Sequence, residues 1–350
     1  MSDTTTGPEE LSIPIGTGIT IAAKAWGPPN SKQRVLALHG WLDNANSFDI
    51  IAPVLANIGI RVVCLDFIGH GRSPHKPNWC NVYYTDYITQ VIDVADALCW
   101  KTFTILGHSM GAGIGSILAA SMPHMVEKLI CLDFIGLLSR EQDQLQAIMY
   151  AMQSRERLIA RKPFLYPSKE SIFEKLKNNN PFIEDDAARL LLQRSIETVI
   201  SPSGEQVYKL RHDPRLVGPS IFTFREHEVL VMLRGIKCPV LLIWGTVSAQ
   251  QFQMKKNWTE VMEKRMKCVK NLEVINVEGS HHFHMETGIE QFTPQLLNFI
   301  STNDSLQSFN PSNESHNNNN NKTTGTLLAQ HNLAENHNQL ADIDIPKAKL

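Results

Sequence analysis

One short segment, Gly107–Gly111 with the sequence GHSMG, restricts the possible folds more than any other part of the 350-residue chain. It follows an apolar stretch that ends at Leu106, and the small-residue stretch Ala112–Ser116 comes directly after it. In a strand–turn–helix of this kind the turn is so tight that the serine takes a strained backbone conformation, and side chains at the flanking glycines would clash. The pattern predicts that the Ser109 hydroxyl points out of a sheet above a helix amino terminus. A glycine-rich turn with a merely structural serine is the alternative.

Short apolar stretches rich in β-branched residues recur along the chain and predict strands. They are Ile19–Ala25, Val35–Leu38, Arg61–Asp66, Thr102–Leu106, Lys128–Asp133, Pro239–Trp244 and Leu272–Val277. Most are apolar almost throughout, as strands covered on both faces must be. Helix-favouring stretches separate the later ones, so the chain is predicted to form an α/β fold with a mostly parallel sheet flanked by helices.

The domain organisation follows from where this alternation starts, breaks and stops. We expect a flexible amino terminus (1–10), an α/β core (11–135 and 235–300), an inserted helical cap (136–234) and a disordered Asn-rich tail (301–350). The cap is inferred because no clear strand is evident there, whereas Glu141–Leu158 and Pro181–Ile200 favour helices. The polar, acidic amino terminus lacks the basic start and apolar stretch of a secretory signal, which is therefore not expected.

The predicted tail is too poor in large apolar residues to offset its ordering entropy, and Asn317–Asn321 is an unbroken Asn run. Its last three residues, Ala348-Lys349-Leu350, resemble the S-K-L type of peroxisomal address. The expected partner is therefore a peroxisomal import receptor, and the expected location is the peroxisome or otherwise the cytoplasm.

Composition excludes several classes of function. Thirty-three basic against thirty-five acidic residues give a net charge of −2, so no positive field is expected to attract nucleic acid. No apolar run reaches the roughly 20 residues needed to cross a bilayer. The six cysteines form no C-x-x-C pair and are expected to be reduced, buried thiols.

A histidine-rich loop, Gly279–Glu286 with the sequence GSHHFHME, follows the last predicted strand. A general base for Ser109 must come from a loop at the same edge of the sheet, but the residues alone do not choose among the three histidines. Three imidazoles also suggest a zinc site. We do not expect a metal or another cofactor, because no carboxylate or cysteine stands at ligand spacing elsewhere.

The segment His39-Gly40-Trp41 follows another predicted strand, Val35–Leu38. The backbone N–H of Trp41, with that of Met110, is a candidate oxyanion hole for a developing negative charge. Trp41 and His108 are candidate substrate contacts, and His39 is expected to be a packed structural imidazole.

Together these motifs resemble the α/β-hydrolase superfamily from about Leu11 to Ile300. More narrowly, His39–Asp49 is similar to the serine hydrolase-like group, which includes the kraken-type proteins, and Asp66–Ser73 resembles the superfamily's D-x-x-G-H-G-x-S stretch. The resemblance implies that the base is His281, five residues before Glu286 in an H-x-x-x-x-E pattern. His282 is the fallback. Ser280 departs from the family's commoner glycine at that place in the loop.

The family often places its triad acid just after the strand that here is Pro239–Trp244, but Ser248 stands there and no carboxylate is near. Some members supply the acid from the end of the preceding strand, which implies Asp133. A dyad without an acid is the alternative.

The expected function is that of a serine hydrolase that cleaves a carboxylic ester or thioester through an acyl-enzyme. A small, mostly apolar substrate would bind beneath the cap. The missing acid near Ser248 motivates the alternative: a weakly active or non-catalytic relative that binds a small apolar ligand under the cap.

Overall fold

The structure is a computed structural model that describes residues 7–16, 18–140, 144–248, 258–286 and 288–302. The chain divides into two units, Met1–Leu306 and Gln307–Leu350. The second unit, which includes most of the expected disordered tail (301–350) and its terminal Ala348–Leu350, lies outside the described residues, whereas residues 301 and 302 are described and Ser301 ends a helix.

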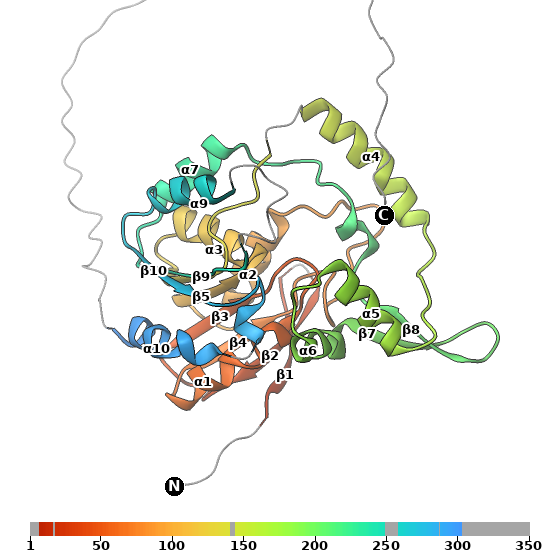
Figure 1. Cartoon of the computed structure of the whole chain (residues 1–350), viewed down its shortest axis with the longest axis horizontal. Coiled ribbons are helices and arrows are strands. Elements are labelled where there is room, and N and C mark those ends of the chain that lie inside the picture. The colour runs from red at the N-terminus through yellow and green to blue at the C-terminus, as the bar shows by residue number, and fades with distance from the viewer. Residues whose placement is uncertain (1–6, 17, 141–143, 249–257, 287, 303–350) are drawn as a thin grey trace, which may run out of the picture. The chain divides into compact units, whose positions relative to one another are not determined.

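Within the described residues, an eight-stranded sheet forms the centre of the first unit (Figure 1). Its strands are β1 (Glu9–Pro14), β2 (Thr20–Trp26), β3 (Arg34–Leu38), β4 (Arg61–Leu65), β5 (Phe103–His108), β6 (Val126–Leu132), β9 (Val240–Gly245) and β10 (Leu272–Val277). Their spatial order is β1-β2-β4-β3-β5-β6-β9-β10. Strand β2 is antiparallel to β1 and β4, and the other neighbours are parallel, which confirms the predicted sheet.

The first strand, β1, was not expected. Its residues Glu9 and Glu10 pair with Ala25 and Lys24, so they belong to the sheet and not to a flexible terminus. The polar composition concealed this strand, because its buried face consists mainly of Ile13 and most of its other residues are exposed.

Helices cover both faces of the sheet (Figure 1). On one face lie α1 (Ile51–Asn57) and α10 (Thr293–Ser301), and on the other lie α2 (Asp86–Ala97), α3 (Met110–Ser121), α7 (Glu226–Gly235) and α9 (Trp258–Met266). Strand β3 shows why its sequence is continuously apolar: Leu36 and Leu38 pack into one core, and Val35 and Ala37 pack into the other.

The segment between β6 and α7 carries α4 (Gln144–Ala160), α5 (Lys169–Asn179), α6 (Asp185–Ser195), β7 (Ile196–Ile200) and β8 (Gln206–Leu210). Strands β7 and β8 form an antiparallel pair, so the expectation that this interval has no strand was wrong. The helix-favouring pattern stops at Ser195, and β7 then reads Ile-Glu-Thr-Val-Ile, which is β-branched at every position except the second. Helix α7 packs with the sheet layer, since its Val229 and Leu233 belong to the core on the α3 face.

A buried arginine ties this segment to the sheet. Arg194 of α6 is 1% exposed, and its guanidinium donates to Asp66 at 2.7 Å and to Glu10 at 2.7 Å. Asp66 is the first residue of the D-x-x-G-H-G-x-S stretch, and it also accepts from the backbone N–H groups of Ala45 and Arg72. The motif therefore serves the architecture: one fully buried carboxylate holds two loops and α6 together.

The six cysteines are free. Cys64, Cys131 and Cys238 are buried as expected, whereas Cys99 is exposed and the other two are half-buried. Among the described residues, no helix combines the length and apolarity needed to span a bilayer.

Candidate active site

Ser109 lies in the turn between β5 and α3 with φ 49° and ψ −110°, a conformation that side-chain-bearing residues rarely adopt. The flanking glycines explain how the turn is possible. A Cβ atom at Gly107 would lie 2.5 Å from the backbone nitrogen of Ala112, and one at Gly111 would lie 1.9 Å from the carbonyl oxygen of Leu38. The clash expected at both positions is therefore present, and the strain is concentrated at the serine.

The two candidate oxyanion donors come from neighbouring parallel strands. Trp41 follows β3 and Met110 follows β5, and Leu38 pairs in register with Gly107, so both loops leave the sheet at the same edge. Within the described residues neither the Trp41 nor the Met110 backbone N–H has a hydrogen-bond acceptor. For Met110 this is the ordinary state of a first helical residue, whose N–H is available to an anion.

Asp133 directly follows β6 and has a positive φ of 60°. Its side chain is fully buried, and its Oδ1 accepts the Gly245 N–H at 2.8 Å. The Nδ1 of His281 lies 2.5 Å from Oδ2 of Asp133. An ionised carboxylate only accepts, so Nδ1 of His281 carries the hydrogen and its Nε2 keeps a lone pair. This is the tautomer that a general base requires.

Ser248 is the residue whose role the sequence concealed. It stands where the family's commoner acid was expected, and its hydroxyl donates to Oδ2 of Asp133. Ser248 therefore supports the carboxylate that contacts His281. The sequence offers one signal for this role, which is a hydroxyl residue at the position where the family's commoner acid is missing. It does not show that the ends of β6 and β9 lie side by side, as the contact between Ser248 and Asp133 requires.

The histidine loop is held by Glu286. The Ser280 hydroxyl donates to Oε1 of Glu286 and accepts the His282 N–H at 3.1 Å, so the serine that replaces the commoner glycine fixes the loop by hydrogen bonds. Of the two neighbouring histidines, His281 contacts Asp133, whereas Nε2 of His282 faces Asp43 at 3.4 Å. The geometry favours His281 over the fallback His282.

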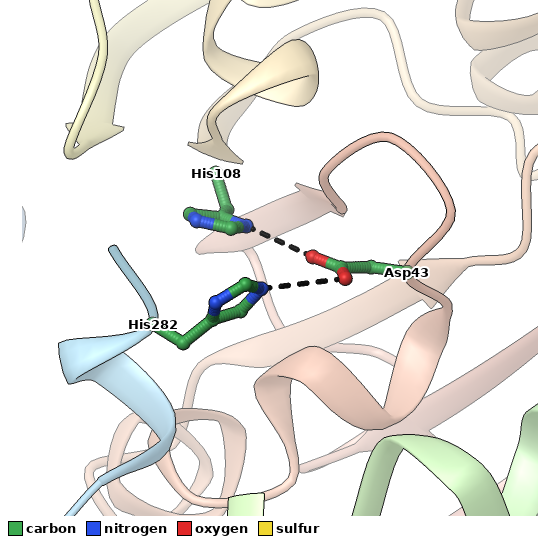
Figure 2. Close-up of side chains that lie close together, drawn as sticks. All are labelled: Asp43, His108 and His282. Atoms are coloured by element: carbon green, nitrogen blue, oxygen red, sulfur yellow. Dashed lines mark hydrogen bonds and ion pairs between the residues drawn. The ribbon is translucent and has the colours of Figure 1, made fainter. Parts of the chain in front are cut away.

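A second buried carboxylate, Asp43, lies between two imidazoles (Figure 2). Its Oδ2 is 3.1 Å from Nδ1 of His108, and its Oδ1 faces His282. The other nitrogen of His108, Nε2, lies 2.9 Å from the carbonyl oxygen of His281. His108 is 1% exposed, so the structure places this expected substrate contact inside the protein, where it supports the backbone of the histidine loop.

The pKa values of His108, Asp43 and His282 are shifted in different directions. Burial lowers the pKa of His108 to about 3, despite its hydrogen bond to Asp43. Burial alone would raise the pKa of Asp43, but the neighbouring His282 and His108 hold it well below its usual range. For His282, Asp43 outweighs the effect of burial and raises the pKa. Asp43 is therefore an anion, and His282 is the imidazole that stabilises its charge most.

Trp41 links the sheet to the inserted segment. Its indole Nε1 donates to the carbonyl oxygen of Leu216 at 3.0 Å, and the residue is 51% exposed. His39 has the structural setting that was expected: it is buried, its Nε2 accepts the Phe67 N–H, and its Nδ1 contacts the Gly40 carbonyl. A depression of about 850 Å³ on another part of the surface includes neither Ser109 nor His281.

Comparison with known proteins identifies the family. Residues 33–248 match the family described as the alpha/beta hydrolase fold. A serine hydrolase-like protein of Dictyostelium discoideum is 63% identical over 338 residues, which cover 96% of this chain and 92% of that protein.

Solved structures are similar over most of the chain. A hypothetical protein from Pseudomonas aeruginosa is 32% identical, with a TM-score of 0.70 over 84% of this chain and 98% of that one. A thioesterase domain from the curacin biosynthetic pathway, 23% identical, has a TM-score of 0.69 over 85% of this chain and 100% of that domain. At that identity the second likeness concerns the fold alone.

Proposed function

The chain belongs to the α/β-hydrolase family and, within it, to the serine hydrolase-like proteins, and from this membership we propose that it cleaves a carboxylic ester or thioester through an acyl-enzyme. One observation carries the proposal: the buried Asp133 carboxylate lies 2.5 Å from Nδ1 of His281. The loop that contains His281 contacts His108, the residue before Ser109, through the His281 carbonyl oxygen. A serine that is activated by a histidine needs the imidazole held in this tautomer.

In the proposed reaction, Oγ of Ser109 bonds to the substrate carbonyl carbon while its proton passes to Nε2 of His281. The backbone N–H groups of Trp41 and Met110 donate to the oxyanion, an interaction whose loss costs about 10²–10³ in turnover in a serine protease. His281 then protonates the leaving alcohol or thiol as the carbonyl forms again. Water, deprotonated by His281, attacks the acyl-enzyme, and collapse of the second intermediate returns the proton to Ser109 and releases the acid.

The segment between β6 and α7 is proposed to cap the site and select a small, mostly apolar substrate. The hydrogen bond from Trp41 to Leu216 supports this placement, because it joins the oxyanion loop to the inserted segment. The apolar side chains Leu145, Met149 and Met152 are at least half exposed on α4, which suits contact with an apolar substrate or surface.

Import into the peroxisome through Ala348-Lys349-Leu350 is part of the proposal. A fluorescent protein fused to the amino terminus should follow the chain into peroxisomes and scatter into the cytosol when these three residues are deleted. An unchanged distribution would contradict this part alone.

The alternative is a non-catalytic relative that binds a small apolar ligand. Its motive was the absence of an acid at Ser248, and the contact of Ser248 and His281 with the same Asp133 carboxylate weakens that motive.

A fluorophosphonate probe distinguishes the two. It should label the wild-type protein and a Ser121→Ala control but not Ser109→Ala. Ser121 is a suitable control because it is an exposed serine at the end of α3, the helix that Ser109 precedes. Failure to label the folded wild-type protein would favour the ligand-binding alternative. A panel of p-nitrophenyl esters of rising chain length then defines the acyl group.

A further inference from the structure

Asp43, His108 and His282 form a buried cluster outside the proposed proton path (Figure 2). One ligand atom from each lies within 4.8 Å of the others, and the residues are 8%, 1% and 7% exposed. They come from three places at one sheet edge: the loop after β3, the end of β5 and the loop after β10. The expectation of no metal relied on the lack of a carboxylate near the histidines, and Asp43 supplies one from 239 residues away in the sequence.

The hydrogen count in this cluster leaves two acceptors facing each other. A neutral imidazole carries one ring hydrogen. If Nε2 of His108 donates to the His281 carbonyl, its Nδ1 presents a lone pair to Oδ2 of Asp43 at 3.1 Å. If Nδ1 of His108 carries the hydrogen, the lone pair on its Nε2 instead faces the His281 carbonyl oxygen. A cation held between Nδ1 of His108 and Oδ2 of Asp43 would satisfy both acceptors while Nε2 of His108 donates to the His281 carbonyl.

We propose that Asp43, His108 and His282 bind a divalent transition-metal ion of the Zn²⁺ or Co²⁺ type. Two imidazole nitrogens and one carboxylate form a donor set that suits zinc. Donors at about 2.0–2.2 Å from a tetrahedral ion lie roughly 3.4 Å apart. Each imidazole nitrogen already lies close to the carboxylate: Nδ1 of His108 is 3.1 Å from Oδ2 of Asp43, and Nε2 of His282 is 3.4 Å from Oδ1.

A fourth nitrogen stands beside the cluster. The His284 ring centre is 4.2 Å from that of His108, and the residue is fully buried. Its Nδ1 has no hydrogen-bond partner among the described residues. An unpartnered buried nitrogen next to the three donors is an independent observation that points to a ligand at this cluster.

Gly40 leaves the space that Asp43 and His108 need to lie close to each other. A Cβ atom at Gly40 would lie 2.6 Å from Oδ2 of Asp43 and 2.8 Å from Nδ1 of His108. A bound ion would join three separate segments and stabilise the folded state by mass action.

The test uses full-length protein and Co²⁺ as the probe. We expect saturable visible absorption bands of a tetrahedral or five-coordinate Co²⁺ complex without a thiolate charge-transfer band, and displacement of Co²⁺ by Zn²⁺. Asp43→Asn and, separately, His282→Asn should weaken this binding at least about tenfold. Zn²⁺ at a hundredfold excess over its Kd should raise the Tm of the wild-type protein by roughly 5 °C.

The matched control is His124→Asn, because His124 is exposed and lies outside the cluster. It should keep the spectrum and the Tm shift. The proposal is overturned if the wild-type protein shows no saturable bands, or if the two ligand variants bind Co²⁺ as tightly as the control does. Each variant is first checked for folding without metal, and the wild-type spectrum decides even if both variants unfold. None of these readouts depends on ester hydrolysis.

Discussion

Two buried carboxylates, Asp133 and Asp43, contact neighbouring histidines of one loop, yet they create different environments. Asp133 also accepts hydrogen bonds from Gly245 and Ser248, and its partner His281 keeps 14% of its side chain exposed. Asp43 instead faces two imidazoles, those of His108 and His282. Adjacent histidines thus acquire different chemistry from the carboxylate that each one meets.

The difference has a simple physical origin. Backbone and side-chain donors of the protein contact Asp133 beside His281, and the contact with His281 is made through Nδ1, so Nε2 of His281 is not used by the carboxylate. Asp43 is instead contacted by the ring nitrogens of His108 and His282, so these imidazoles interact with the carboxylate itself. The first arrangement suits proton transfer, and the second suits binding a cation.

The largest expected effect separates the two histidines. His281→Ala should lower kcat for a p-nitrophenyl ester by at least about 10⁴-fold, because no base remains for Ser109. His282→Ala should lower it by about tenfold, through loss of loop positioning alone. Equal losses in the two variants would erase the distinction between the histidines.

Substitution of the two carboxylates should affect kcat in the same order as substitution of the histidines that they contact. Asp133→Asn preserves shape but favours the wrong tautomer of His281, and a fall in kcat of about 10⁴ is expected. Asp43→Asn acts only through His108 and the loop backbone, so we expect about a tenfold fall. Steady-state kinetics on folded variants measure both, and undiminished turnover in Asp133→Asn would remove Asp133 from the mechanism.

Ser248 provides a finer test of why Asp133 is the acid. Ser248→Ala removes one hydrogen bond to a charged group and should lower kcat by about tenfold. In Asp133→Asn/Ser248→Asp the acid moves to the family's commoner position, and kcat should exceed that of Asp133→Asn alone by at least about tenfold. A double variant no better than the single one would show that the second position cannot reach His281.

The smallest effect concerns His70, a buried histidine without a carboxylate contact. Burial, followed by the nearby His39, lowers the pKa of His70 well below its usual value. On acidification below about pH 6.5 the unfolded chain gains a proton there and the folded chain does not, so the free energy of unfolding falls by about 1.4 kcal/mol per pH unit.

Urea unfolding between pH 5 and 7.5 measures this slope. It should decrease by that amount in His70→Asn and stay unchanged in His124→Asn, whose side chain is in solvent in the folded state. A slope that survives the His70 substitution would assign the acid sensitivity to other groups.

Much of the fold followed from local pattern. Apolar runs marked the seven expected strands, and the glycines around Ser109 marked the turn, because tight backbone geometry and burial on both faces leave local signatures. Strand β1 escaped because most of its residues are exposed, and β7 escaped because β-branched residues directly follow a helix.

The site was predictable only in part, because its contacts are long-range. His281 and Asp133 came from resemblance, and the structure places them in contact across 148 residues. The support from Ser248 and the link between Asp43 and His282 depend on which loops meet at one sheet edge. No local pattern encodes that adjacency, which arises from the order of parallel strands.

The central claim is that Ser109 carries the acyl group after activation by His281. Rapid-quench kinetics with p-nitrophenyl acetate, combined with mass spectrometry of the quenched protein, test it directly. The account predicts a burst of one equivalent of p-nitrophenol, with one acetyl group located on Ser109. Turnover without acetylation of Ser109, or turnover that persists in Ser109→Ala, would contradict it.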